Sequence, residues 1–167
     1  GVPTSLNPIL EQKLTEVITI PLPETSSGSL SLTAREKIID LARSSDVVAL
    51  GPGLSLKEDT PSLVRQLVID LPTPLVLDAD GLNALVGATE IFSQRKAATV
   101  ITPHPGELAR LLGVSSDEIQ QDRLGFARRA AARWNLVVVL KGARSIICSP
   151  DGHLSINPTG NAGMASA

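Results

Sequence analysis

Short, wholly apolar runs that alternate with amphipathic segments are the feature that most constrains the fold of this chain. The runs end at Leu50, Leu77, Ile101 and Leu140. Short strands that are apolar on both sides are typical of a parallel sheet that is covered on both faces by helices. The alternation therefore predicts an α/β fold with a mostly parallel central sheet, whose strands are 47–50, 75–77, 99–101 and 136–140.

Local signals predict what lies between and beside these strands. Pro105 suits the first turn of a helix that ends at Gly113. Capping boxes at 33–36 and 115–118 predict two further helix starts, the second helix running on to Trp134. In the remaining sequence we expect helices over 8–14 and around 63–71, a strand over 17–20, and a C-terminal hairpin of 145–148 with 153–156 at a mixed edge of the sheet.

Length and composition narrow the functional classes. The 167 residues fit a single domain, 1–167. The net charge of −2, with two Phe, one Trp and no Tyr, argues against a nucleic-acid surface. Neither a membrane span nor a signal peptide is evident, so we expect a cytoplasmic protein without membrane contacts. The single cysteine, Cys148, excludes an internal disulfide and is expected in the core, and His153 is expected at the surface.

Polar or glycine-containing loops follow the predicted strands, at the edge where parallel sheets bind ligands. Gly51-Pro52-Gly53 either lets the backbone approach a ligand or forms an ordinary turn, and it matches neither phosphate-loop pattern. Asp78 and Asp80 either hold Mg²⁺ or its waters, or cap the helix around 82–86. Asn83 suits either task.

Two further segments carry candidate side chains. His104 and Glu107 are three residues apart and do not form the H-E-x-x-H pattern of a zinc protease. His104 suits a hydrogen bond to a polar substrate, whereas Glu107 is either functional or a complement to the helix dipole. Lys141 follows a very apolar strand, so it either faces an anion in a crevice or is solvated at the strand end. The small residues 159–165 suit phosphate binding if a helix follows them.

The order and wording of these segments carry a family resemblance. The segments 47–54 (VVALGPGL), 77–85 (LDADGLNAL), 101–108 (ITPHPGEL), 139–143 (VLKGA) and 157–165 (NPTGNAGMA) together resemble the ADP/ATP-dependent NAD(P)H-hydrate dehydratases of the ribokinase-like superfamily. The resemblance implies a three-layer α/β/α domain that is incomplete at both ends. One departure is Ala162, which stands where the family usually has proline.

By the same resemblance, a nucleotide phosphorylates the hydroxyl of hydrated NADH or NADPH (NADHX or NADPHX), and phosphate then leaves. Mg²⁺ and ADP or ATP are implied, as is a homotetramer. Gly53 and His104 match hydrate-binding positions, and Glu107, with Asp80 and Asn83, is associated with phosphate and Mg²⁺. No residue is assigned as a direct metal ligand. The nucleotide-binding stretch is Lys141, Gly142, Ala143, Arg144 and Ser145.

The catalytic aspartate of the family belongs to a Gly-Gly-x-Gly-Asp segment that would follow Ala167, so we expect no catalytic base in residues 1–167 and no turnover by this chain alone. Two alternatives stay open. One is a different ribokinase-like kinase of the thiamine-pathway or pyridoxal type, although such kinases tend to have Thr-Pro-Asn where this chain has Thr102-Pro103-His104. The other is a nucleotide-binding polypeptide without catalysis.

Overall fold

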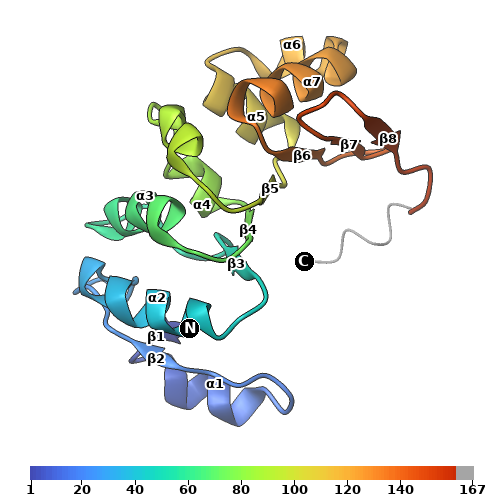
Figure 1. The fold of residues 1–167 in the computed structure, drawn as a ribbon. Helices are drawn as coiled ribbons and strands as arrows, with labels where there is room; N and C mark the ends of the chain where they lie inside the picture. The colour runs from blue at the N-terminus through green and yellow to red at the C-terminus, as the bar shows by residue number, and fades with distance from the viewer. Residues whose placement is uncertain (161–167) are drawn as a thin grey trace.

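The central element of the fold is a six-stranded sheet, seen in a computed structural model that describes residues 1–160 (Figure 1). Its strands lie in chain order, and the first four pair in parallel while the last two are antiparallel. The mostly parallel sheet and its mixed hairpin edge are therefore confirmed. The strands are β3 (Val48–Leu50), β4 (Leu75–Leu77), β5 (Thr99–Ile101), β6 (Val137–Leu140), β7 (Ile146–Cys148) and β8 (Leu154–Ile156).

The strand order decides where the helices lie. Each parallel strand is followed by its immediate neighbour, and crossovers between parallel strands are nearly always right-handed. Consecutive crossovers therefore place their helices on the same face, as Figure 1 shows. No helix among residues 1–160 is long and apolar enough to cross a membrane. The connecting helices are α3 (Thr60–Asp70), α4 (Asp80–Asn83), η2 (Thr89–Gln94), α5 (Pro105–Leu112), α6 (Ser116–Gln121) and α7 (Arg123–Trp134).

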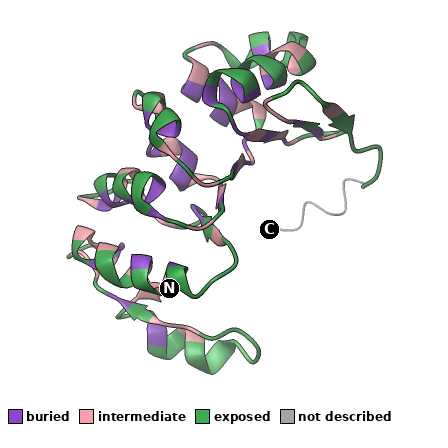
Figure 2. Ribbon diagram, viewed as in Figure 1, coloured by how far each residue is buried: buried purple, intermediate pink, exposed green. Residues whose placement is uncertain are grey.

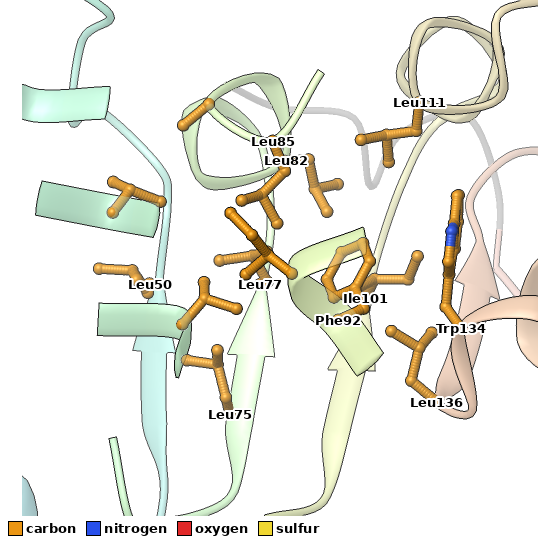
Figure 3. Close-up of a cluster of buried hydrophobic side chains, with 14 of the residues drawn as sticks. Leu50, Leu75, Leu77, Leu82, Leu85, Phe92, Ile101, Leu111, Trp134 and Leu136 are labelled. Atoms are coloured by element: carbon orange, nitrogen blue, oxygen red, sulfur yellow. The ribbon is translucent and has the colours of Figure 1, made fainter. Parts of the chain in front are cut away.

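The hydrophobic core lies between this helical layer and the sheet (Figure 3). Leu50, Leu77 and Ile101 are register partners on adjacent strands and point toward the helices. Phe92 of η2 and Trp134 of α7 close the core, with ring centroids 5.3 Å apart. Cys148 is fully buried on β7 and His153 is exposed, so both predictions about these residues are confirmed.

The opposite face of the sheet is apolar but more accessible. Val76, Val100 and Val139 alternate with the buried residues and are partly exposed, and Ile147 is 39% exposed. Figure 2 shows the buried residues gathered where the helices meet the sheet. Two of the three expected layers, the sheet and one helical layer, therefore lie within the described residues.

The N-terminal part differs from the prediction in one element. Helix α1 (Asn7–Lys13) is present, but the strand predicted over 17–20 is wrong. Val17 and Ile18 are 61% and 88% exposed, so their β-branched side chains find no surface on which to pack. The chain pairs instead at β2 (Pro21–Leu22), which runs parallel to β1 (Val2–Pro3) and buries Leu22.

Two helix starts also differ. The expected capping box at 33–36 does not form, because the Ser31 side chain accepts the Thr33 N–H and begins η1 (Leu32–Ala34), which leads into α2 (Arg35–Arg43). The Ser115–Glu118 capping box is confirmed, but the helix it begins stops at Asp122. Asp122 then caps α7 by accepting the Gly125 N–H. A Cβ on Gly125 would lie 2.1 Å from the Asp122 carboxylate, so glycine at this position leaves room for the cap of α7.

Candidate active site

The loops that follow β3, β4, β5 and β6 are joined side by side by backbone hydrogen bonds. The Asp78 N–H donates to the Leu50 carbonyl at 3.1 Å, and the Thr102 N–H donates to the Leu77 carbonyl at 3.0 Å. The Lys141 N–H donates to the Pro103 carbonyl at 2.8 Å. These bonds hold the polar loops at one edge of the sheet, which we call the carboxyl rim (residues 51–55, 78–83, 102–107 and 141–145).

A cluster of charged side chains lies on the carboxyl rim. Lys141 Nζ lies 2.6 Å from Asp78 Oδ1 and 3.9 Å from Glu107 Oε2. The Lys141 side chain is 39% exposed, whereas that of Glu107 is 5% exposed. The ammonium group therefore has a carboxylate partner and remains accessible to an anion from solvent.

Asp78 is held in its charged form by its neighbours. Partial burial by itself would raise the pKa of Asp78, but hydrogen bonds from Lys141 and from the Ala79 N–H, together with the charge of Lys141, lower that pKa below its ordinary value of 3.8. Asp78 and Lys141 thus form an ion pair at neutral pH.

His104 and Glu107 begin α5 as a reciprocal capping box. His104 Nδ1 accepts the N–H groups of Gly106 and Glu107, and the His104 N–H donates to Glu107 Oε2 at 2.8 Å. Because Nδ1 is an acceptor, Nε2 carries the proton of the neutral ring and is a hydrogen-bond donor. The His104 side chain is 51% exposed, so a polar substrate can reach it.

The remaining predicted residues build the loops beside this cluster. An Asp80 oxygen accepts the Ser55 N–H at 2.8 Å and so holds the loop that contains Gly53. Asn83 Oδ1 accepts from Arg110 Nε at 3.1 Å and ties α4 to α5. Gly53 has a φ of +74°, and a Cβ at this position would meet no heavy atom within 4 Å. Gly53 also lines a pocket with Pro52, Leu54 and the 28–30 turn.

The 141–145 loop is held by Arg123, a residue that the sequence analysis did not predict. Arg123 Nη1 donates to the Ala143 carbonyl at 2.8 Å, and a Cβ on Gly142 would lie 2.9 Å from Arg123 Nη2. Ser145 Oγ donates to the Gly142 carbonyl at 3.2 Å, and Arg144 has a φ of +58°. No sequence signal links Arg123 to this loop, because about one helix and one strand separate them along the chain.

The structure brings Lys141, Glu107 and His104 together through the Glu107 carboxylate and adds Asp78 to them. Asp80 and Asn83 contact neighbouring loops rather than this cluster. The role of Asp78 as the partner of Lys141 carries only a weak signal in the sequence, namely an acidic residue directly after a buried strand. The small-residue segment 159–165 lies mostly outside the described residues.

The carboxylates of the rim do not form a preorganised metal site. Among residues 1–160 no group of three or more His, Cys, Asp or Glu side chains could hold a metal ion. Each of the three rim carboxylates already has a partner: Lys141 pairs with Asp78, the Ser55 N–H donates to Asp80, and the His104 N–H donates to Glu107. This donor set fits Mg²⁺ only as an ion that keeps its own waters and arrives on nucleotide phosphates.

The fold of this chain is shared with a broad class of known structures. A ribokinase-like superfamily protein from Enterococcus faecalis superposes with a TM-score of 0.64 over 81% of this chain and 46% of that one, at 23% identity. The chain thus has a ribokinase-like α/β fold, as expected from its sequence.

Sequence comparison identifies one family among the proteins that share this fold. The family model for NAD(P)H-hydrate dehydratase matches residues 6–167, and the chain belongs to this family. It is similar to the bifunctional NAD(P)H-hydrate repair enzyme of Moorella thermoacetica, with 47% identity over all of this chain and 32% of that protein. It is also similar to the crystal structure of the ADP/ATP-dependent NAD(P)H-hydrate dehydratase from Bacillus subtilis, co-crystallized with ATP/Mg²⁺ and soaked with CoA. That comparison has a TM-score of 0.74 and 30% identity, covering 98% of this chain and 55% of that one. The chain therefore spans about a third of the length of the bifunctional relative.

Proposed function

We propose that this chain forms part of an ADP/ATP-dependent NAD(P)H-hydrate dehydratase. The observation that carries the proposal is the joint placement of Lys141, Glu107 and His104 at the carboxyl rim of a chain that belongs to this family. A cation, a buried carboxylate and an exposed hydrogen-bond donor at one edge suit the joint binding of a nucleotide and a polar second substrate.

Each group has a role that follows from its contacts. Lys141 offers an exposed ammonium to phosphate oxygens, and the glycine after it allows the backbone of 142–145 to approach the nucleotide. His104 Nε2 donates a hydrogen bond to the hydrate, and Gly53, which lines a pocket with the 28–30 turn, allows the backbone there to approach a ligand. Glu107 fixes the His104 backbone and contributes negative charge beside Lys141. Asp80 and Asn83 maintain the loops on which these groups lie.

The reaction proposed is phosphoryl transfer followed by elimination. The hydroxyl oxygen of NADHX or NADPHX attacks the terminal phosphorus of ADP or ATP and displaces AMP or ADP, while the hydroxyl proton passes to a base. Loss of inorganic phosphate, together with a proton from the neighbouring ring carbon, then restores the dihydronicotinamide. We expect that base to be an aspartate beyond residue 167, as the family resemblance implies. Mg²⁺ supplies charge neutralisation of the phosphates when it is bound with the nucleotide.

A turnover assay tests this proposal. The full-length polypeptide containing this sequence is given NADHX or NADPHX with ADP or ATP, and the return of dihydronicotinamide absorbance is followed. We expect turnover that requires the nucleotide and is lost in K141M. The 167-residue chain, its length checked by intact mass, is expected to show no turnover. Phosphorylation of a thiamine-pathway or pyridoxal-type substrate, with no reaction of the hydrates, would overturn the assignment in favour of a kinase.

Assembly is a separate proposal. A homotetramer is expected from the family resemblance, and the partly exposed apolar sheet face is an additional reason to expect contacts with further polypeptide. Light scattering of the full-length polypeptide gives the mass that checks it, and a monomer would refute it.

A further inference from the structure

Lys141 is held by one particular carboxylate. Its Nζ lies 2.6 Å from Asp78 Oδ1, whereas the nearer Glu107 oxygen is 3.9 Å away, beyond hydrogen-bond distance. The two partners come from the ends of β6 and β4, which are not adjacent strands. The hydrogen bond to Asp78 therefore draws the Lys141 side chain across the end of β5, over the middle of the carboxyl rim.

Asp78 is well suited to be a fixed anchor, because its backbone is constrained on both sides. Its N–H donates to the Leu50 carbonyl at 3.1 Å, and its carbonyl accepts the Gly81 N–H at 2.9 Å. That carbonyl also packs so closely on Gly51 that a Cβ there would lie 1.7 Å from it. A carboxylate on such a backbone has little freedom to follow a mobile lysine, so the lysine is the partner that becomes ordered.

An ammonium group has three N–H donors. The hydrogen bond to Asp78 uses one of them, and the 39% exposure of the Lys141 side chain leaves the head accessible from solvent for the others. Glu107 meanwhile uses Oε2 to accept the His104 N–H. If the lysine moved to Glu107, it would compete for the oxygen that completes the capping box of α5.

We propose that Asp78 is a positioning residue for nucleotide binding: it holds the Lys141 ammonium over the carboxyl rim with donors free for phosphate oxygens, and it keeps that ammonium from Glu107. This inference rests on the proposed function, in which Lys141 binds the nucleotide. It assigns the preorganisation of Lys141 to Asp78.

The sign of one measurement separates positioning from simple electrostatics. Asp78 is a negative charge close to where phosphates would bind, so through its charge alone its removal should tighten nucleotide binding. Through positioning, its removal should weaken binding, because the long lysine side chain must then be ordered by the nucleotide itself. A change in the fold would alter stability and the affinity for both substrates together.

The experiment measures the dissociation constant of a non-hydrolysable ATP analogue with Mg²⁺, by calorimetry, on the full-length polypeptide. The variants are D78A, D78N, K141M and the D78A/K141M double variant. D78N keeps the side-chain shape and an acceptor oxygen, so it preserves the test if D78A does not fold. The matched control is D70A, which breaks a comparable ion pair of 2.7 Å between Asp70 and Arg35, with Asp70 33% exposed, at the end of α3 rather than on the rim.

We expect D78A to raise the dissociation constant roughly three- to tenfold, which corresponds to the cost of ordering one long side chain. D78N should show a smaller rise, and K141M a rise of about tenfold or more. In the K141M background, D78A should have no further weakening effect. D70A should bind as the parent does, and the KM for the hydrate should change less than twofold in D78A and D78N.

The outcomes are distinct. If K141M binds the analogue as tightly as the parent, or the parent does not bind it, the proposed function itself fails. If K141M weakens binding but D78A and D78N leave it unchanged or tighten it, Asp78 does not position Lys141 and only this inference is overturned. Equal weakening by D78A in the presence and absence of Lys141 would also overturn it.

Discussion

Replacing Ala79 with glycine should stabilise this protein, although the same change usually destabilises a folded chain. Residues 78–81 form a turn closed by the hydrogen bond from the Gly81 N–H to the Asp78 carbonyl, 2.9 Å long. Ala79 has φ +48° and ψ −119°. These angles are those of the first central position of a type II′ turn, which is dominated by glycine because a Cβ is strained there.

The size of the effect follows from two opposing contributions. A non-glycine residue in a sparsely populated backbone region costs about 1–3 kcal/mol, which glycine would recover. Glycine also gives the unfolded chain more freedom, which costs about 0.4–1 kcal/mol. The expected net result for A79G is a gain of about 1 kcal/mol in the free energy of unfolding.

Urea denaturation of A79G and of a matched control measures this difference. The control is A132G, which makes the same chemical change at an exposed position of α7, where glycine should cost about 1 kcal/mol. The two variants should therefore shift the midpoint in opposite directions with unchanged m-values. A loss of stability in A79G as large as that in A132G would refute the reasoning from the turn.

Other predictions concern the carboxyl rim and the buried cysteine on β7. G51A should lower the free energy of unfolding by about 3 kcal/mol or more, because Gly51 has a φ of +145° and a Cβ there would lie 1.7 Å from the Asp78 carbonyl. G53A should lower it by only about 1 kcal/mol, because Gly53 has a φ of +74° but open space around it. Urea denaturation measures both changes. H104A should lose about 1 kcal/mol of stability with its cap, and H104N only a few tenths, whereas turnover of the hydrate should fall in both if the ring binds it. Because the pKa of Asp78 is lowered, its ion pair stabilises the fold at pH values above the ordinary pKa of 3.8. This stabilisation is lost as the pH falls through the lowered pKa. The free energy of unfolding, measured across acidic pH, should therefore depend less on pH in D78N. Cys148, whose pKa is raised by burial, should react with a thiol reagent only after unfolding.

The sequence predicted the sheet well because its strands and helices are specified locally. Apolar runs such as 75–77, and stop signals such as Gly113, act over a few residues, and the structure confirms them. The strand expected over 17–20 failed because β-branched residues form strands only where a partner and a surface exist, and Ile18 is 88% exposed. Whether a strand finds a partner is decided by distant parts of the chain.

The candidate site shows the same division. His104, Glu107 and Lys141 follow predicted strands, so the rule for parallel sheets places them on one rim. What the sequence does not contain is the pairing: Asp78 and Lys141 are 63 residues apart, and Arg123 reaches the 141–145 loop from a different helix. Such contacts depend on the register of the sheet and on side-chain directions, which no local pattern encodes.

The two ends of the strands are held by different contacts. At the carboxyl rim, Gly51, Ala79 and Gly142 have φ values of +145°, +48° and +140° directly after or close to their strands. Near the amino ends of the strands, Arg95 donates hydrogen bonds to carbonyl groups at the end of α3, including that of Leu71 at 2.9 Å, and so stabilises the end of this helix. Of the three rim residues only Ala79 is strained, because glycine adopts positive φ values freely, and strained backbone persists only where its surroundings fix it. The surroundings that fix Ala79 include the hydrogen bond from the Gly81 N–H to the Asp78 carbonyl and the close packing of that carbonyl on Gly51, so the residue that constrains this turn also sets the position of the cation.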